Sequence, residues 1–325
     1  MEAKHDSVLM KEVLEVLAIK HDDTVIDATI GGAGHFSAML SALGEGGVLV
    51  GIDADPTAVD RGREAYAYDR RPERPIAHMI NDNFRNLEHI LERLGIGQAD
   101  KILFDLGWSG YQMSALRGFS FSSSDGQDQP LLMNYGLPIE ANGNIQTAAD
   151  IVNTFSEEDL ADIIFSYGEE RFARGIARAI VKARSKERIL TTGALVSAIL
   201  DGTPSWYHKR KIHPATKTFQ ALRIAVNDEL GSLREGLAAA LAALAPNGRL
   251  AVISFHSIED RAVKNMLRDA SQSGSGLILT KKPIIPTRAE VLSNRRARSA
   301  KLRIFERSAV SADRIDISIP ILSYV

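Results

Sequence analysis

The 325-residue chain contains no cysteine and no long hydrophobic run. Without cysteine, disulfide bonds, thiolate zinc sites and cysteine nucleophiles are excluded, and the absence fits a cytoplasmic protein. No apolar run approaches the roughly 20 residues that a membrane-spanning helix needs. No hydrophobic signal segment follows the first six residues either. We therefore expect a cytoplasmic protein without a membrane partner.

The chain also lacks a dominant sign of charge. Its 39 basic and 41 acidic residues give a formal net charge of −2. Because the balance is nearly neutral, any surface that binds nucleic acid must be local. With 45% hydrophobic residues, the chain has the composition of a soluble globular protein. Its length allows one large or two ordinary domains.

A glycine-rich turn is the most informative feature that is present. Residues 25–35 read VIDATIGGAGH, and a second apolar run, residues 48–52, ends in Asp53. Glycines let the backbone approach a ligand, and an acid about 20 residues further on is placed to accept hydrogen bonds from ribose hydroxyls. The turn lacks the full G-x-G-x-x-G fingerprint and the Lys-Ser/Thr of a P-loop. This combination favours S-adenosylmethionine over NAD or ATP; a tight turn without a ligand is the alternative.

Strand-like and helix-like segments alternate through the first third of the chain. A helix is expected over Ser7–Ile19, followed by strands near 24–28, 48–52, 76–80 and 100–106, with helices near 35–43, 56–67 and 84–94 between them. This alternation predicts a parallel sheet, in which ligands bind at the carboxyl ends of the strands. The polar or glycine residues expected at those ends are Gly31–His35, Asp53, Asn83–Phe84 and Asp105.

The pattern changes after residue 112. Residues 113–146 are rich in Ser, Gly, Asn, Gln and Asp, and helices are then expected near 154–165, 169–185 and 192–200. A long helix over 218–244 leads back to strands near 249–255, 276–281 and 301–307. The simplest topology is one α/β domain interrupted by a helical insertion.

Asp105 ends the fourth predicted strand and opens the polar segment DLGWSG. In amino-group methyltransferases, a short polar loop at this place accepts a hydrogen bond from the exocyclic amine. Such an acceptor stabilises the positive charge that develops on the attacking nitrogen. Asp105 is therefore the candidate for this role; a strand-end aspartate that caps the following turn is the alternative.

Histidines are spaced in a way that does not predict a metal site, because no H-x-x-x-H or H-E-x-x-H pattern occurs. Phe255 and His256 follow the fifth predicted strand, where a flipped base could stack. The neighbouring Ser, His and acid are sequential, whereas a hydrolase triad is assembled from distant positions. A hydrolase is therefore disfavoured.

Two basic clusters stand out against the neutral background. One precedes and enters the long helix, and the other precedes the last strand. Basic side chains beside a helix N-terminus can bind phosphates, and two separate clusters favour a local RNA groove; solvated surface charge is the alternative. The predicted RNA-binding residues are Lys209, Arg210, Lys211, Lys217, Arg223, Arg296 and Arg298.

Seven motifs together resemble the MraW/RsmH family, bacterial methyltransferases that modify the N4 amino group of a cytidine in 16S ribosomal RNA. They occur in the family's order and span nearly the whole chain. They are DATIGGAGH at 27–35, FDLG at 104–107, RGFSF at 117–121, YGEERFA at 167–173, HPATKTFQALR at 213–223, VISFHSIEDR at 252–261 and RARSAKLR at 296–303.

The resemblance implies an α/β fold: a Rossmann-like class I methyltransferase sheet with an inserted helical domain. The methyltransferase domain would comprise 1–112 and 216–325, and the substrate-recognition insertion 113–215. The cofactor would be S-adenosylmethionine, and no metal is expected. The implied cofactor-binding residues are Gly32, Ala33, Gly34, His35, Asp53, Phe84, Asp105 and Gln112, and the catalytic candidates are Asp105, Ser109 and His256.

The implied partner is 16S ribosomal RNA within the small ribosomal subunit, and the helical insertion is also a candidate surface for a homodimer. The chain departs from the family where residues 125–134 read DGQDQPLLMN and residues 108–111 read WSGY. The first departure motivates an alternative, an RNA-binding ribosome assembly factor with a relic cofactor pocket. A methyltransferase acting on another nucleic-acid or protein amine is a further alternative.

Overall fold

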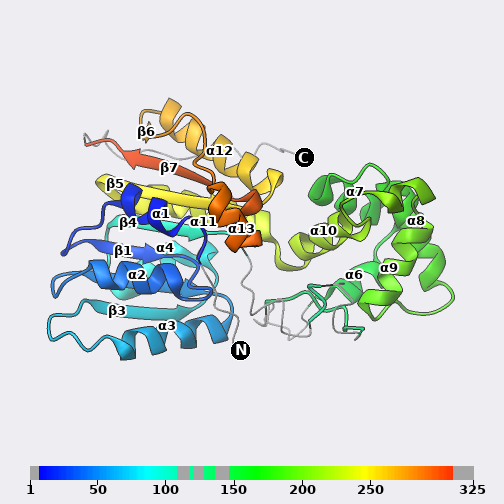
Figure 1. Ribbon diagram of the computed structural model, residues 1–325, viewed down its shortest axis with the longest axis horizontal. Coiled ribbons are helices and arrows are strands. Elements are labelled where there is room, and N and C mark those ends of the chain that lie inside the picture. The colour runs from blue at the N-terminus through cyan, green and yellow to red at the C-terminus, as the bar shows by residue number, and fades with distance from the viewer. Residues whose placement is uncertain (1–6, 108–116, 121–127, 136–145, 310–325) are drawn as a thin grey trace. The chain divides into compact units, whose positions relative to one another are not determined.

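The computed structural model describes residues 7–107, 117–120, 128–135 and 146–309 (Figure 1). The chain forms two compact units. The first comprises Met1–Ser109 and Leu230–Leu322, and the second Gly110–Glu229. An α/β domain interrupted by a helical insertion is thus confirmed. None of the described helices is long and apolar enough to cross a bilayer.

A seven-stranded sheet forms the centre of the first unit, with the order β3-β2-β1-β4-β5-β7-β6. Neighbouring strands from β3 to β5 pair in parallel, whereas β7 is antiparallel to both β5 and β6. This is the strand order of class I methyltransferases. The strands are β1 (Thr24–Asp27), β2 (Val48–Asp53), β3 (Ile76–Asn81), β4 (Ala99–Asp105), β5 (Leu244–Ser254), β6 (Gly276–Ile278) and β7 (Lys301–Arg307).

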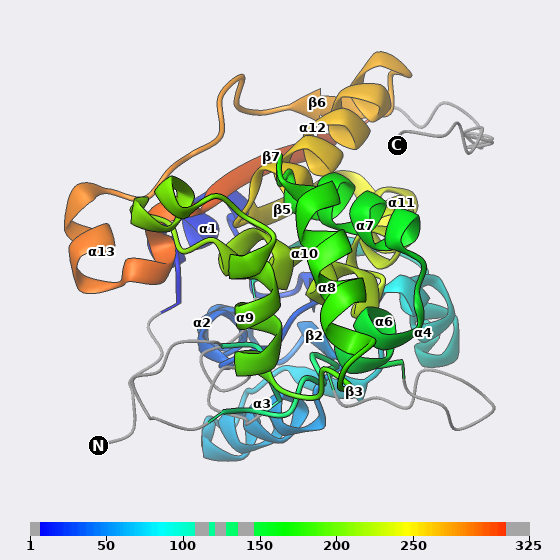
Figure 2. The same ribbon diagram turned by 90° about the vertical axis from the view of Figure 1, so that its right-hand side faces the viewer.

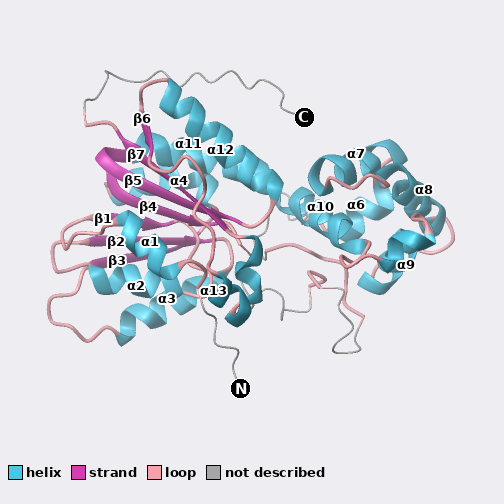
Figure 3. Ribbon diagram, turned by 45° about the horizontal axis from the view of Figure 1, so that its top comes forward, coloured by secondary structure: helices cyan, strands magenta, loops and turns pink. Residues whose placement is uncertain are grey.

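Helices cover both faces of this sheet (Figure 3). Successive residues of a strand point to opposite faces of the sheet. Leu103 therefore packs with one helical layer and Phe104 with the other. One layer contains α1 (Met10–Leu17), α2 (Gly34–Ala42) and α3 (Pro56–Tyr68); the other contains α4 (Leu87–Leu94), α11 (Glu229–Ala243) and α12 (Ser257–Gln272). The strands are therefore buried on both sides, which leaves the carboxyl ends of β1, β2 and β4 as places where polar groups can gather.

The first four strands form the parallel sheet that their alternation with helices predicted, whereas β7 runs in the opposite direction. Lys301, the first residue of β7, lies opposite Ser254, the last residue of β5. The connection from β6 must therefore return to the carboxyl-end edge before β7 begins. This connection contains α13 (Arg288–Ser293) and the 3-10 helix η4 (Arg295–Ser299). A basic segment is thereby brought to the edge where ligands of α/β sheets bind.

The second unit is helical among its described residues (Figure 2). Side-chain caps begin several of its helices, including Thr147, Ser156 and Thr191. The elements are α6 (Ala148–Thr154), α7 (Glu157–Gly168), α8 (Ala173–Arg184), α9 (Thr192–Asp201), the 3-10 helix η3 (Ser205–Lys209) and α10 (Ala215–Asn227). The sequence did not predict α6, a helix of only two turns.

The boundary of the insertion differs from the predicted one at its end. The prediction placed residues from 216 onward in the methyltransferase domain, but α10 belongs to the second unit. A Cβ added to Gly168 of α7 would lie 2.6 Å from the carbonyl oxygen of Lys217 in α10. Only glycine allows so close an approach of the two helices. The packing of α10 on α7 therefore moves the boundary to residue 229.

The single long helix expected over 218–244 is in fact two helices. Asp228 adopts a left-handed conformation with φ of 44° and ends α10, its N–H bonding to the carbonyl oxygen of Ala225. Aspartate is among the residues that tolerate this conformation. The Asn227 amide donates to the carbonyl oxygen of Met133, which fixes the chain at the break. Hydrophobic spacing alone does not reveal such a break because both helices are apolar on one side.

Candidate active site

The acid at the end of β2 holds the glycine turn in place. Asp53 Oδ2 accepts a hydrogen bond of 2.8 Å from the Gly31 N–H, and its Oδ1 accepts one of 2.8 Å from the Asp55 N–H. Gly31 and Ala33 both have positive φ, of 53° and 60°. The turn is therefore tight, and Asp53 bonds to its backbone; the ribose contact predicted for Asp53 stays a prediction. Gly32 and Gly34 lie in the same turn and at the start of α2.

Asp27, the last residue of β1, is fully buried below this turn. Its Oδ1 accepts the Thr29 N–H at 3.1 Å, whereas its Oδ2 has no hydrogen-bond partner among the described residues. Burial raises the pKa of Asp27 to about 8, although the charge of His35 opposes the shift. Burial likewise raises the pKa of Asp53 to about 6, against hydrogen bonds from two backbone N–H groups. Both carboxyls therefore keep a proton to a higher pH than an exposed aspartate does.

The raised pKa of Asp27 predicts a specific pH dependence of stability. The native state holds a proton that the unfolded chain has lost between about pH 4 and pH 8, so the free energy of unfolding falls with rising pH in this window. The slope approaches about 1.4 kcal/mol per pH unit for one such group. We expect Asp27→Asn to flatten this slope in urea unfolding curves from pH 5 to pH 8. The exposed Asp60→Asn serves as control, and equal slopes for Asp27→Asn and the parent protein would contradict the prediction.

His35 connects the glycine turn to the end of β4. The imidazole is buried, with its Nδ1 3.4 Å from Asp105 Oδ2 and its Nε2 3.1 Å from the Val8 carbonyl oxygen. Burial lowers the pKa of His35, but the hydrogen bond and charge of Asp105, together with Asp27, outweigh it and raise the pKa above its usual value. The protonated ring can donate from both nitrogens, which holds Asp105 in place.

Asp105 is the most accessible acid of this group. Its side chain is 21% exposed, against 4% for His35. Its backbone N–H donates to Thr29 Oγ1 at 2.7 Å, and its Oδ1 has no hydrogen-bond partner among the described residues. This oxygen is buried and unsatisfied, so a ligand bound at the end of β4 can supply the missing hydrogen bond. Asp105 ends β4 as expected, and the role predicted for it stays a prediction.

Arg296 lies close enough to Asp105 for their charges to interact. Burial lowers the pKa of the Arg296 guanidinium, while the charge of Asp105 raises it. The sequence assigned Arg296 to an RNA surface together with Arg298, which is exposed on the same 3-10 helix. The structure instead brings Arg296 into the electrostatic environment of the acid cluster. The cause is the reversed β7, which returns η4 to the carboxyl-end edge.

Phe84 opens the 3-10 helix η1 (Phe84–Asn86) after β3. Its ring meets Phe104 edge-on, with centroids 5.3 Å apart, and a Cβ added to Gly236 would lie 2.6 Å from its Cδ2 atom. Asn83 caps the turn by accepting the Arg85 N–H. The ring is therefore fixed yet only half-buried, as a wall for a flat ligand requires.

His256 has a structural role that the sequence did not predict. Its Nδ1 accepts the Glu259 N–H at 3.4 Å as the N-cap of α12, and its Nε2 lies 2.9 Å from Glu259 Oε1. Glu259 Oε2 in turn accepts the Phe255 N–H at 3.0 Å. Phe255 packs over Gly107, where an added Cβ would lie 2.6 Å from the ring. The predicted catalytic role of His256 stays a prediction, while its capping role is visible.

The remaining basic residues differ in their accessibility. Lys209, Arg210 and Lys211 are exposed in and after η3. Lys217 donates to the carbonyl oxygen of Glu169 at 2.6 Å. Arg223 is buried and forms two hydrogen bonds to Glu229, of 2.7 and 2.8 Å. Contrary to the expectation that it binds RNA, Arg223 is occupied inside the helical unit, because it lies on the packed side of α10.

Ser109 and Gln112 lie outside the described residues, so their roles stay predictions. Sequence reasoning did not select Asp27 or Arg61, whose Nε donates to the Gly31 carbonyl oxygen at 2.9 Å. Asp27 could have been selected as a site residue, because an acid that ends an otherwise apolar strand is expected to be buried at the carboxyl end of that strand. No feature of the sequence distinguishes Arg61 from the other polar residues of α3.

The chain is similar to known proteins over nearly its whole length. Residues 2–308 match the model of the MraW methylase family. A ribosomal RNA small subunit methyltransferase H from Deinococcus deserti is 47% identical over 94% of this chain and 94% of its own. Proteins of the same name from Geobacter sulfurreducens and Brevibacillus brevis are 44% and 42% identical, covering 94% and 93% of this chain and 100% and 98% of theirs. Because the family model matches residues 2–308 and these relatives are at least 42% identical over nearly the whole chain, the chain belongs to the MraW methylase family.

Proposed function

We propose that this protein transfers a methyl group from S-adenosylmethionine to the exocyclic N4 amine of a cytidine in 16S ribosomal RNA of the small subunit. The observation that carries the proposal is the carboxylate of Asp105, whose Oδ2 lies 3.4 Å from His35 Nδ1 while its buried Oδ1 has no hydrogen-bond partner among the described residues. Support comes from membership of a methylase family and from relatives named as small-subunit ribosomal RNA methyltransferases. The substrate implies a cytoplasmic location, and the homodimer stays a prediction.

The residues present fit S-adenosylmethionine. The glycine turn leaves its backbone open at the end of β1, and each Asp53 oxygen keeps a second lone pair for a ribose hydroxyl. The unpartnered Oδ2 of Asp27 lies beneath this turn and can interact with a cationic part of the cofactor. Phe84 offers a half-buried ring to the adenine. These residues would hold the cofactor.

The cofactor supplies a methyl group on a positively charged sulfur. The N4 amine of cytosine is a poor nucleophile because its lone pair is delocalised into the ring. Asp105 Oδ1 would accept a hydrogen bond from this amine, localise the lone pair and stabilise the positive charge that develops on nitrogen. His35 keeps Asp105 oriented, so that much of the rate arises from positioning. The methylated nitrogen is acidic and releases its proton to water.

The ribose role of Asp53 is testable by cofactor binding. We expect Asp53→Ala to raise the dissociation constant of S-adenosylhomocysteine by about 10- to 100-fold, because a hydrogen bond to a charged acceptor contributes roughly 1.5–3 kcal/mol. Titration calorimetry measures it. Asp60→Ala, on the exposed face of α3, is the matched control. An unchanged dissociation constant for Asp53→Ala would remove the ribose role.

The direct test of function supplies methyl-labelled S-adenosylmethionine and small ribosomal subunits that lack the N4-methyl mark. The RNA is then digested to nucleosides. Label in N4-methylcytidine is the expected result. Label in another nucleoside or in protein would indicate another amine substrate. RNA binding without any transfer would indicate the assembly-factor alternative.

A further inference from the structure

A row of basic side chains runs along one side of α8. Arg174, Arg178 and Lys182 follow one another at intervals of four residues, and Lys186 continues the row beyond the helix; all four are exposed. Four residues of helix advance about 6 Å, so these charges form a nearly straight stripe. We name these four residues the α8 track. The Nε atom of one member, Arg178, lies 3.5 Å from Glu157 Oε1. Both side chains are exposed, and such an exposed ion pair contributes little to stability.

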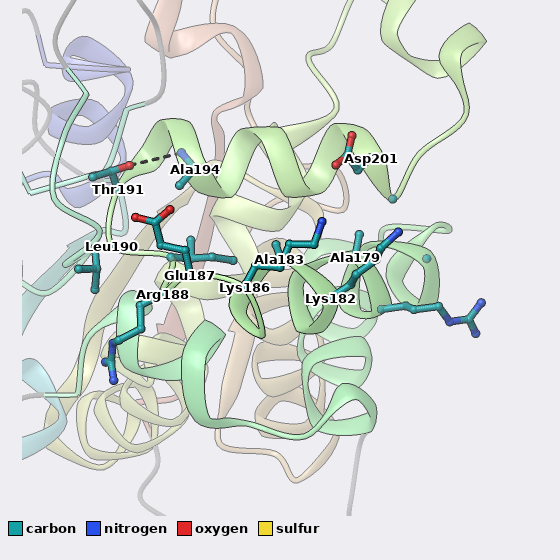
Figure 4. Close-up of a pocket in the computed structure, with 14 residues that line it drawn as sticks. Ala179, Lys182, Ala183, Lys186, Glu187, Arg188, Leu190, Thr191, Ala194 and Asp201 are labelled. Carbon is teal, nitrogen blue, oxygen red and sulfur yellow. Dashed lines mark hydrogen bonds between the residues drawn. The ribbon is translucent and has the colours of Figure 1, made fainter.

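A groove of about 1070 Å³ accompanies the track between α8 and α9 (Figure 4). Lys182 of α8 and Lys186, just after this helix, extend into the space beside α9. Four basic and two acidic side chains line the groove, so it carries a net positive charge. They are Arg178, Lys182, Lys186, Arg188, Glu187 and Asp201. An extended anionic ligand is complementary to this lining.

An aromatic platform adjoins the start of the track. Trp206 is 54% exposed, and its ring meets those of Phe172 and Tyr207 edge-on, at centroid distances of 5.9 and 5.8 Å. The Arg171 guanidinium lies 4.8 Å from the Trp206 centroid and 4.7 Å from that of Phe172. Tyr207 is buried and donates a 2.6 Å hydrogen bond to Glu170, which anchors the cluster. Such an exposed, rigid indole beside an arginine is a stacking surface.

The aromatic platform is close in the chain to one end of the groove. Gly175 and Gly202 line one end of the groove. A Cβ added to Gly175 would lie 2.6 Å from the Gly202 carbonyl oxygen, so α8 and the end of α9 touch there. Phe172 precedes Gly175 by less than one helical turn, and Trp206 follows Gly202 by four residues. The aromatic platform is therefore built from the chain segments that adjoin the Gly175–Gly202 end of the groove.

We propose that this surface binds a single-stranded segment of the RNA substrate, with phosphates along the α8 track and a base stacked on Trp206. The inference rests on the proposed function, since it assumes RNA as partner. An aromatic ring in line with spaced cations is the combination that binds unpaired RNA, because stacking needs a free base face and the cations follow the backbone. An acidic protein would also be attracted by the basic side chains, but its binding would not require the exposed indole of Trp206.

The first test measures binding of the full chain to a fluorescent, protein-free single-stranded RNA by anisotropy. We expect Trp206→Ala to weaken binding about tenfold or more, since stacking of one base is of that size. Trp206→Phe should retain most of the affinity. The double variant Arg178→Gln/Lys182→Gln should also weaken binding and reduce the salt slope by about 0.7 for each lost phosphate contact. Lys264→Gln on α12 is the matched control for a lost exposed charge.

Stacking has its own spectroscopic readout. Trp108 and Trp206 are the two tryptophans of the chain. With Trp108 replaced by Phe, the remaining indole emission reports on Trp206 alone. We expect it to be quenched on addition of the RNA, with a midpoint equal to the anisotropy dissociation constant. Unquenched Trp206 emission at a saturating RNA concentration would contradict the inference that a base stacks on Trp206.

The outcomes separate this inference from the proposed function. Binding that the Trp206 and track variants leave within twofold of the parent protein would overturn the inference, whatever the enzymatic result. Variants that lose affinity for small subunits but not for protein-free RNA would also overturn it and assign the surface to a protein partner. Failure of methyl transfer with the variant effects on RNA binding intact would refute the proposed reaction alone. Urea unfolding curves, which we expect to match those of the parent protein, verify that each variant is folded.

Discussion

Asp105→Asn is expected to lower kcat for methyl transfer by about 10²- to 10³-fold, the size typical of a lost electrostatic contact to a developing charge. The amide keeps the shape and the oxygen of the side chain but loses its negative charge. The unpartnered Oδ1 of Asp105 would then no longer stabilise a positively charged nitrogen. Single-turnover assays with labelled S-adenosylmethionine measure the effect on the chemical step.

The control for this variant lies on the same strand. Asp100→Asn, at the amino end of β4, keeps an oxygen that can accept the Thr24 N–H at 2.9 Å and should retain normal turnover. The dissociation constant of S-adenosylhomocysteine should change by less than about threefold in Asp105→Asn, because the contact forms chiefly in the transition state. Near-normal turnover of Asp105→Asn would refute the assignment.

Asp260→Leu is expected to lower the free energy of unfolding by about 3–5 kcal/mol, the usual effect of breaking a buried charge pair from one side. Asp260 in α12 is buried and binds two cations of β7, Lys301 at 2.8 Å and Arg303 at 2.7 Å. Without the carboxylate, the guanidinium of Arg303 remains buried and unpaired. Urea unfolding at pH 7 measures the loss.

A second substitution and the pH dependence make this prediction specific. Arg303→Met in the Asp260→Leu background removes the stranded charge and should recover much of the stability. Burial raises the pKa of Asp260, but the hydrogen bonds from Arg303 and Lys301 outweigh it and hold the pKa below its usual value. The stabilisation is therefore present above the unfolded pKa of about 3.9 and is lost as pH falls through the folded pKa. An equal loss of unfolding free energy in the single and double variants would contradict this account.

Asp260 and Arg303 also explain two of the sequence motifs. The motif over 252–261 contributes the acid, and the motif over 296–303 contributes its cations. Sequence analysis assigned the second motif to RNA because a run of arginines is typical of such surfaces. In the structure, Arg303 supports the sheet, Arg296 lies near Asp105, and Arg298 is exposed. One basic run thus serves three different purposes.

The strand ends were predictable because local sequence determines them. Buried parallel strands read as apolar runs, and the first polar residue after each run marks its carboxyl end; Asp53 and Asp105 were found this way. The glycine turn was predictable for the same reason, since positive φ at Gly31 has a residue signature. Helix α10 was placed correctly as a helix but in the wrong unit, because its partner α7 is distant in sequence.

Long-range pairing set the limit of the sequence analysis. The direction of β7, the ion pair of Arg223 with Glu229 and the approach of Arg296 to Asp105 all depend on which segments meet in space. The hydrophobic periodicity of a single sequence does not predict these long-range contacts. Arg223 also shows that a basic residue in a basic segment need not be on the surface, since one helix turn decides between solvent and core.

The insertion between β4 and β5 has a consequence for the order of folding. Phe104 pairs with Val252 across the two central strands, so nearly 150 residues separate partners that hydrogen-bond in the finished sheet. At a synthesis rate of about 5–20 residues per second, the first four strands wait on the order of 10 s for the fifth. During that interval β4 is an unpaired, apolar edge, which is prone to aggregate. Closing so long a loop costs little more entropy than closing one of half its length, so we expect the delay, rather than the chain entropy, to make the nascent protein depend on chaperones.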